Sequence, residues 1–271
     1  MCQLQRERFR ITSRILETIY QKYHKPEFIH PDPLELVLRY RTPEDQEIAG
    51  LIAASFATGR VNSILKTVES ILAPFPSLKK DLLAADRAAL NLLFQDFKYR
   101  FYPSSSLVDF LEGIKKTVLH FGSLENCFLS GSCDKESPHD SLLSGLISLV
   151  HSVGEEAGAS RSVLPDPDKG SAVKRLNMYA RWMIRSDEID PGTWKSLSSA
   201  ILVIPLDTHI MQISHILGFT RRTQADMKTA LEITEALRTF DKTDPVRFDF
   251  SLSRLGIHPD LSYEELDRIM T

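Results

Sequence analysis

The feature that most constrains this chain is an apolar pattern with a helical period, repeated along most of the sequence. Val and Ile residues do not alternate with polar residues over any stretch long enough to predict a sheet. Residues that start and end helices punctuate the pattern instead. Hydrophobic residues make up 42% of the 271 residues, which is enough to bury a core. The sequence therefore predicts an all-α fold and excludes disorder as the main state.

Turn-forming residues divide the pattern into separate helices. Thr42, Pro43 and Asp45 have the types expected of an N-cap, a first-turn proline and the carboxylate of a capping box. A stretch rich in Gly, Ser, Asp and Pro, Gly131–Gly170, predicts a loop or a crossing between lobes. The predicted helices cover residues of about 4–23, 34–41, 43–56, 61–72, 78–94, 106–120, 140–152, 171–186, 208–217, 224–239, 245–255 and 262–270.

Composition and charge exclude several classes of protein. The longest apolar stretch, Ser199–Leu206, is far shorter than the roughly 18 residues needed to cross a bilayer. The first ten residues carry Arg and Gln without an apolar core, so we expect no secretory signal and a cytoplasmic protein. Three cysteines, Cys2, Cys127 and Cys133, predict neither a disulfide framework nor a metal site. The net charge of −3 argues mildly against a general nucleic-acid binder.

The segment Ile204–Ile210 places an acidic residue, Asp207, where a helix begins after a proline and an apolar run. One interpretation is N-capping, for which Asp is among the best residues. The other uses the same geometry, because helix-terminal amides favour a charged carboxylate. Such a carboxylate can stabilise a cationic, oxocarbenium-like transition state or orient a water, as cleavage of an N-glycosidic bond requires. The two interpretations are compatible.

The segment Lys169–Arg185 contains several basic residues and no acidic one. On a helix, Lys174, Arg181 and Arg185 share one face. This face is either solvated surface, with Arg stems covering apolar groups, or a stripe that contacts the phosphates of a duplex.

The junction Ser55–Asn62 lies between two predicted helices and places Phe56 and Arg60 near a turn. Most of this helix pair must be core, because it is almost entirely apolar. The alternative interpretation of Phe56 is a wedge residue, which fills the gap left when a base is turned out of a duplex.

Together these segments resemble the helix-hairpin-helix DNA glycosylase superfamily, which includes endonuclease III-like and archaeal 8-oxoguanine enzymes. The run Leu206–Ile210, followed by Leu217–Gly218, is similar to the motif in which Asp-Thr-His opens a helix that ends in Leu-Gly. The resemblance implies that Asp207 is the catalytic carboxylate. It also places Phe56 where many members have a Gln that probes the duplex.

The resemblance implies further site residues, and the chain departs from the pattern at some of them. Where the superfamily has a Leu-Pro-Gly-Val-Gly hairpin, the chain has Pro191 and Gly192, followed by Thr193 and Trp194. Lys195 is the candidate for a Schiff-base nucleophile, with an exposed lysine or a phosphate contact as the alternative. No cysteine set follows Gly256, so no iron–sulfur cluster is expected.

A closer resemblance is to an uncharacterised bacterial family, domain of unknown function 2400, over residues of about 30–258. It is carried by the motifs Lys174–Met178, Arg181–Met183, Trp194–Ser196, Ile204–Asp207 and Asp244–Phe250.

These resemblances imply one two-lobed helical domain over residues 1–271 with a central cleft. One lobe would contain residues of about 40–165, and the other would combine 1–39 with 166–271. The implied function is a DNA-repair N-glycosylase, with or without lyase activity, that binds a duplex containing a damaged base and uses no cofactor or metal. Asp207 and Lys195 are the predicted catalytic residues, and His209 is expected to be structural. The predicted nucleic-acid contacts are Lys174, Arg175, Arg181, Arg185, Gly192, Phe56 and Arg60.

Two alternatives remain open at this point. The first is a non-catalytic DNA- or RNA-binding protein on the same scaffold, and the second is a helical protein-interaction module.

Overall fold

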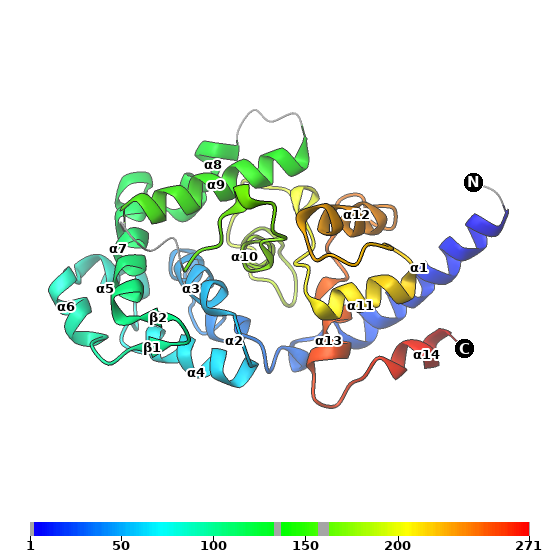
Figure 1. Ribbon diagram of the computed structural model, residues 1–271, viewed down its shortest axis with the longest axis horizontal. Coiled ribbons are helices and arrows are strands. Elements are labelled where there is room, and N and C mark those ends of the chain that lie inside the picture. Colours follow the sequence, from blue (N-terminus) through cyan, green and yellow to red (C-terminus); the bar gives the residue numbers. More distant parts are fainter. Residues whose placement is uncertain (1–2, 133–136, 157–162, 271) are drawn as a thin grey trace.

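The computed structural model describes residues 3–132, 137–156 and 163–270, and these residues are mostly helical (Figure 1). The predicted all-α class is therefore confirmed. The α-helices of the described residues are α1 (Gln3–Tyr23), α2 (Leu34–Val37), α3 (Pro43–Phe56), α4 (Val61–Leu72), α5 (Leu78–Ala84), α6 (Arg87–Leu93), α7 (Ser104–Phe121), α8 (Leu124–Ser132), α9 (Pro138–Glu156), α10 (Lys174–Ile184), α11 (Thr208–Leu217), α12 (Met227–Arg238), α13 (Asp249–Ile257) and α14 (Glu264–Met270).

Local capping residues explain several helix boundaries. The Thr42 hydroxyl accepts a hydrogen bond from the Asp45 backbone amide at the start of α3, as predicted. The boundaries of α4 and α11 agree with those predicted. The predicted helix 78–94 is two helices instead, because Asp86 caps a new one by accepting a bond from Ala89 N at 2.8 Å.

Other boundaries differ from the prediction. α12 begins after Asp226, which is its cap, rather than after Thr223. α13 begins only at Asp249 and continues past Gly256. Helix α8 and a short β-hairpin, β1 (Lys98–Tyr99) paired with β2 (Tyr102–Pro103), were not predicted. Within the stretch Gly131–Gly170, helix α9 contains the predicted helix 140–152 and is longer at both ends. Parts of this stretch, including Cys133, lie outside the described residues, as does Cys2.

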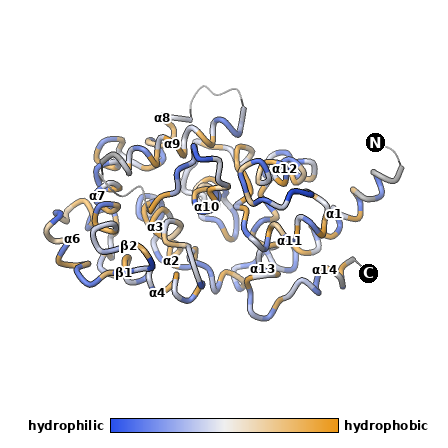
Figure 2. The backbone as a smooth tube through the Cα atoms, viewed as in Figure 1, coloured by the Kyte–Doolittle hydropathy of each residue, from blue (hydrophilic) through white to orange (hydrophobic). Residues whose placement is uncertain are grey.

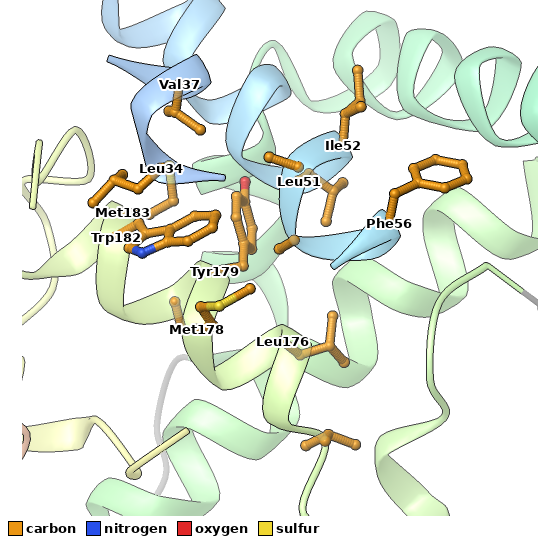
Figure 3. Packing of buried hydrophobic residues seen from close by; sticks show 14 of the residues in the cluster. Leu34, Val37, Leu51, Ile52, Phe56, Leu176, Met178, Tyr179, Trp182 and Met183 are labelled. Atoms are coloured by element: carbon orange, nitrogen blue, oxygen red, sulfur yellow. The ribbon is translucent and has the colours of Figure 1, made fainter. Parts of the chain in front are cut away.

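The core is centred on the contact between α3 and α10, whose hydrophobic residues meet in the middle of the molecule (Figure 2). Tyr179, Trp182 and Met183 of α10 lie against α2 and α3 in Figure 3. A Cβ on Gly50 would lie only 2.8 Å from the Met183 methyl carbon, so a glycine is required for this approach of the two helices.

A buried carboxylate ties α3 to two other segments. Glu47 is 3% exposed and accepts hydrogen bonds from the Leu124 and Glu125 amides at the start of α8, and from Trp194 Nε1. Burial raises the pKa of Glu47, and these three donors oppose that effect.

The helices pack around α10 on two sides in Figure 1. Helix α3 contacts α2, α4 and α5, and α7 packs on α8 and α9. On the other side, α1 contacts α13 and α14, and α11 contacts α13. The segment at α2, which we predicted to belong with the C-terminal third, contacts α3 and α4. The division into two lobes remains a prediction.

Candidate functional site

Asp207 caps α11, as predicted. It follows a buried extended segment, Leu202–Leu206, and its own backbone is extended. Oδ1 accepts hydrogen bonds from the His209 and Ile210 amides, both at 2.9 Å. The other oxygen, Oδ2, lies 3.6 Å from Lys174 Nζ. The cap therefore occupies one carboxylate oxygen, while the second faces a cation.

The carboxylate of Asp207 lies in a cavity of about 710 Å³. Its side chain is 18% exposed and that of Lys174 is 34% exposed, so solvent reaches both. The walls come from six parts of the sequence: the loop Pro31–Pro33, the turn Ala57–Gly59 with the start of α4, the N-terminal half of α10, the start of α11, Ala225 before α12, and the end of α13. A volume of this size, with a few polar groups in the wall, is typical of pockets that bind small ligands.

A second carboxylate in the cavity wall, Asp32, was not predicted. Its Oδ2 accepts a hydrogen bond from Arg254 Nη2 at 2.8 Å, and its Oδ1 accepts one from the Leu34 amide at 3.0 Å. Arg254 is 2% exposed and also donates to the Phe28 carbonyl. Asp32 is thus neutralised by a buried arginine, which leaves Asp207 as the carboxylate better placed for a ligand.

His209 also lines the cavity and contacts a residue from the C-terminal helix region. Its Nδ1 lies 2.6 Å from the Tyr263 hydroxyl. A Cβ on Gly256 would lie 2.1 Å from this nitrogen and 2.4 Å from the hydroxyl oxygen, so Gly256 makes room for the pair. No local sequence pattern identifies Tyr263, because the two residues in contact are 54 positions apart.

Two predicted phosphate contacts on α10 are corrected by the structure. Arg181 and Arg185 are 5% and 4% exposed. Arg181 pairs with Asp190 and Asp249, and Arg185 pairs with Asp187, Asp190 and Asp244. Both guanidinium groups are enclosed and neutralised, so they cannot reach a phosphate at the surface.

Burial and charge pairing have opposite effects on the pKa values in this buried network, and burial prevails at Asp244 and Asp249, whose pKa values are raised. Burial alone would lower the pKa of Arg181, but the charges of Asp190 and Asp249 raise it. Burial would raise the pKa of Asp187, but a hydrogen bond from His24 and the charge of Arg185 hold it well below its usual range. The network ties α10 to α1, to α13 and to the loop that follows α10.

Arg175 and Phe56 both make contacts within the fold, and the structure contradicts the predicted role of Phe56. Arg175 Nη1 donates to the carbonyls of Ser55 and Val163. Phe56 is fully buried and lies edge-on to Phe97 and Tyr102, so it cannot act as a wedge in a duplex.

The predicted hairpin grip around Gly192 is also corrected. The Gly192 amide donates to the Trp182 carbonyl at 3.0 Å, and the Trp194 amide donates to the Met183 carbonyl at 2.7 Å. These amides bind the end of α10, so they are not available to a phosphate. Lys195 is exposed, and its Nζ lies 3.5 Å from Ser186 Oγ. It is not among the residues that line the Asp207 cavity.

Lys174 and Arg60 are the predicted nucleic-acid contacts that the structure leaves near the cavity. Lys174 lines it directly, and Arg60 is exposed beside the lining turn Ala57–Gly59. The structure thus brings Asp207 and Lys174 together and places Lys195, Arg185 and Gly192 elsewhere. The buried Arg181 lines a small cavity of about 30 Å³ beside Asp207 and Lys174.

Within the described ranges, no group of three or more His, Cys, Asp or Glu residues has the arrangement of a metal site. No helix among those residues has the length and apolar character to span a membrane. Cys127 is a buried free thiol whose pKa is raised by burial.

Comparison with known proteins gives one result. The family model described as "Protein of unknown function (DUF2400)" matches residues 32–258, which contain all the predicted site residues. No curated protein and no solved structure matches the chain.

Proposed function

The chain belongs to this family of unknown function, DUF2400, and we propose that it is a glycosylase-like DNA-repair protein that cleaves the N-glycosidic bond of a damaged base. The observation that carries the proposal is the Asp207 carboxylate, which is fixed by two backbone amides and faces an open cavity of about 710 Å³. This volume is within the range of pockets that hold a ligand of nucleotide size.

The charges in the cavity match the charges that such a reaction develops. Breaking an N-glycosidic bond leaves positive charge on the sugar and negative charge on the departing base. Asp207 supplies a fixed negative charge that can stabilise the positive sugar, and Lys174, 3.6 Å away, supplies a positive charge that can stabilise the departing base. Because two amides already orient the carboxylate, little reorganisation is needed during the reaction.

The finer architecture belongs to the same proposal. A helix-hairpin-helix glycosylase-like arrangement has two helical lobes with a cleft between them. Helix α10 lies between the group that contains α3 and the group that contains α11 and α13 (Figure 1). Residues of α4, α10, α11 and α13 line the cavity. This arrangement supports a cleft at the Asp207 end of α10.

Lyase activity requires an amine that can reach the sugar. The resemblance assigned that role to Lys195, whereas the lysine in the cavity wall is Lys174. Borohydride reduction traps the covalent imine between a lysine and the sugar of an abasic site, so it shows whether Lys174 or Lys195 supplies the amine. If lyase activity exists, we expect Lys174→Met to abolish trapping and Lys195→Met to retain it.

The direct test is base release from duplexes that each carry one damaged base, such as uracil, hypoxanthine, 8-oxoguanine or an alkylated purine. We expect release from at least one of them and a loss of about 100- to 1,000-fold in Asp207→Asn, the usual cost of removing a charge-stabilising group. Asp86→Asn is the matched control, because Asp86 caps α6 in the same way and lies outside the cavity. Asn also caps helices well, so both variants are expected to fold.

The outcomes also separate the alternatives. Salt-dependent duplex binding without base release would favour a non-catalytic nucleic-acid-binding protein, whose supporting observation is the absence of available amides at Gly192. If a folded Asp207→Asn variant keeps full activity, Asp207 acts only as a helix cap and not in catalysis. If no duplex or RNA binds with a dependence on salt, the protein-interaction module is favoured.

A further inference from the structure

The β-hairpin formed by β1 and β2 has an unusual turn. Lys98 pairs with Pro103 and Tyr99 with Tyr102, so Arg100 and Phe101 alone form the turn. Two-residue hairpin turns favour Asn and Gly, because they require a positive φ. Arg100 adopts a φ of +53° without being either residue. The turn is therefore held by something other than its own conformational preference.

Contacts on both strands explain what holds the hairpin. Tyr99 and Tyr102 are buried and lie edge-on to Phe56, which anchors the hairpin in the core. The Tyr99 hydroxyl donates a hydrogen bond of 2.6 Å to the Thr58 carbonyl. A Cβ on Gly59 would lie 2.7 Å from Arg100 Nη1, so the arginine lies directly over this glycine.

These contacts place the turn at the edge of the Asp207 cavity. Thr58 and Gly59, which the hairpin contacts, are both part of the cavity wall. Phe101 at the tip is 75% exposed, more than any other large hydrophobic side chain among the described residues. Its ring lies 5.2 Å from the Arg100 guanidinium carbon. A single exposed Phe is ordinary, but this one is on an anchored turn beside a cavity.

The same edge carries unneutralised positive charge. Arg60, Lys98 and Arg100 are exposed, and no ion pair joins any of them to a carboxylate of the described residues. Arg60 follows Gly59 in sequence, Arg100 lies over the same glycine, and Lys98 begins the strand that leads to Arg100. Unpaired cations beside an exposed aromatic ring are the usual features of a surface that binds unpaired nucleotides.

We propose that the hairpin tip binds an unpaired base of a nucleic-acid strand at the mouth of the Asp207 cavity. The Phe101 ring stacks on the base, and Arg60, Lys98 and Arg100 contact the adjacent phosphates. The proposal rests on the nucleic-acid-binding part of the proposed function and not on catalysis. It also assigns to Phe101 the contact that sequence analysis assigned to Phe56.

The test measures the affinity of the full chain for a duplex in which 2-aminopurine lies opposite an abasic-site analogue. For the wild type we expect salt-dependent binding and a change in 2-aminopurine fluorescence from stacking. Phe101→Ala should bind about tenfold more weakly and lose the fluorescence change, since one stacked base contributes about that much. Phe101→Tyr should retain both. Lys98→Ala should lower the slope of log affinity against log salt by about 0.9, the value of one phosphate contact.

Leu92→Ala is the matched control, because Leu92 on α6 is 70% exposed and lies outside the cavity wall. We expect this variant to bind like the wild type. Equal binding by the wild type and Phe101→Ala, with an unchanged fluorescence signal, would overturn the hairpin proposal and leave the function of Asp207 in place. If the wild type binds no duplex, both the hairpin proposal and the proposed function are overturned. If Asp207→Asn loses only base release, the hairpin proposal is retained.

Discussion

The molecule contains two sets of positively charged residues that differ in burial and in pairing with carboxylates. Arg181 and Arg185 on α10 are buried, and carboxylates pair with both of them. Arg60, Lys98 and Arg100 at the cavity edge are exposed and have no such partner among the described residues. The first set stabilises the fold, and the second is free to bind an external anion. A basic run in a sequence therefore does not by itself identify a nucleic-acid surface.

The largest expected effect that tests this contrast comes from the buried set. Arg181→Met would leave Asp190 and Asp249 without their shared partner. We expect the free energy of unfolding to fall by about 3–5 kcal/mol, the usual cost of breaking a buried pair. Urea denaturation followed by circular dichroism measures this change. Arg100→Met is the control, and a similar loss in that variant would contradict the contrast.

A smaller effect depends on pH. The pKa of Asp187 is held below its usual range, so its charged form stabilises the fold at every pH above the ordinary carboxyl pKa of about 3.9. That contribution is lost as the pH falls through the folded-state pKa. Asp187→Asn should reduce stability by about 2 kcal/mol at pH 7, the value of a hydrogen bond to a charged group. The difference from the wild type should shrink as the pH falls below 4. A difference that is constant from pH 7 to pH 3 would show that the charge of Asp187 is not involved.

The smallest expected effect on stability is at the cavity edge. Arg60→Ala should change the free energy of unfolding by less than about 0.5 kcal/mol, because the side chain is exposed and pairs with no described carboxylate. The same variant should bind a duplex with a smaller dependence on salt. If stability falls by more than 1 kcal/mol, Arg60 belongs with the structural set.

The helix boundaries predicted well are those set by residues adjacent in sequence. Asp207 and Gly218 define α11 from its two ends, and a sequence shows both. The β-hairpin was missed because Arg100 and Phe101 carry no turn signal, and distant contacts hold them in place. Helix α8 was missed for a related reason, since its start is stabilised by Glu47, 77 residues away.

The residues of the candidate site also differ in whether a local sequence pattern predicts their contacts. Asp207 could be identified because its capping geometry is local. The burial of Arg181 could not, because one of its partners, Asp249, is 68 residues away. Asp32 joins the cavity wall through a buried arginine 222 residues away, and no local pattern predicts that contact. The local sequence thus predicts the helix cap at Asp207, but it does not predict the burial of Arg181 and Arg185.

The contact between His209 and Tyr263 has a consequence for comparing members of the family. The region shared with the family ends at residue 258, so Tyr263 lies outside it, whereas His209 and Gly256 lie inside. Which of the two imidazole nitrogens carries hydrogen is governed by the hydrogen bond that the other one makes. The hydrogen bond with Tyr263 therefore influences whether Nε2 of His209 is a donor or an acceptor toward the cavity, and it does so through a residue beyond the range that the family model matches.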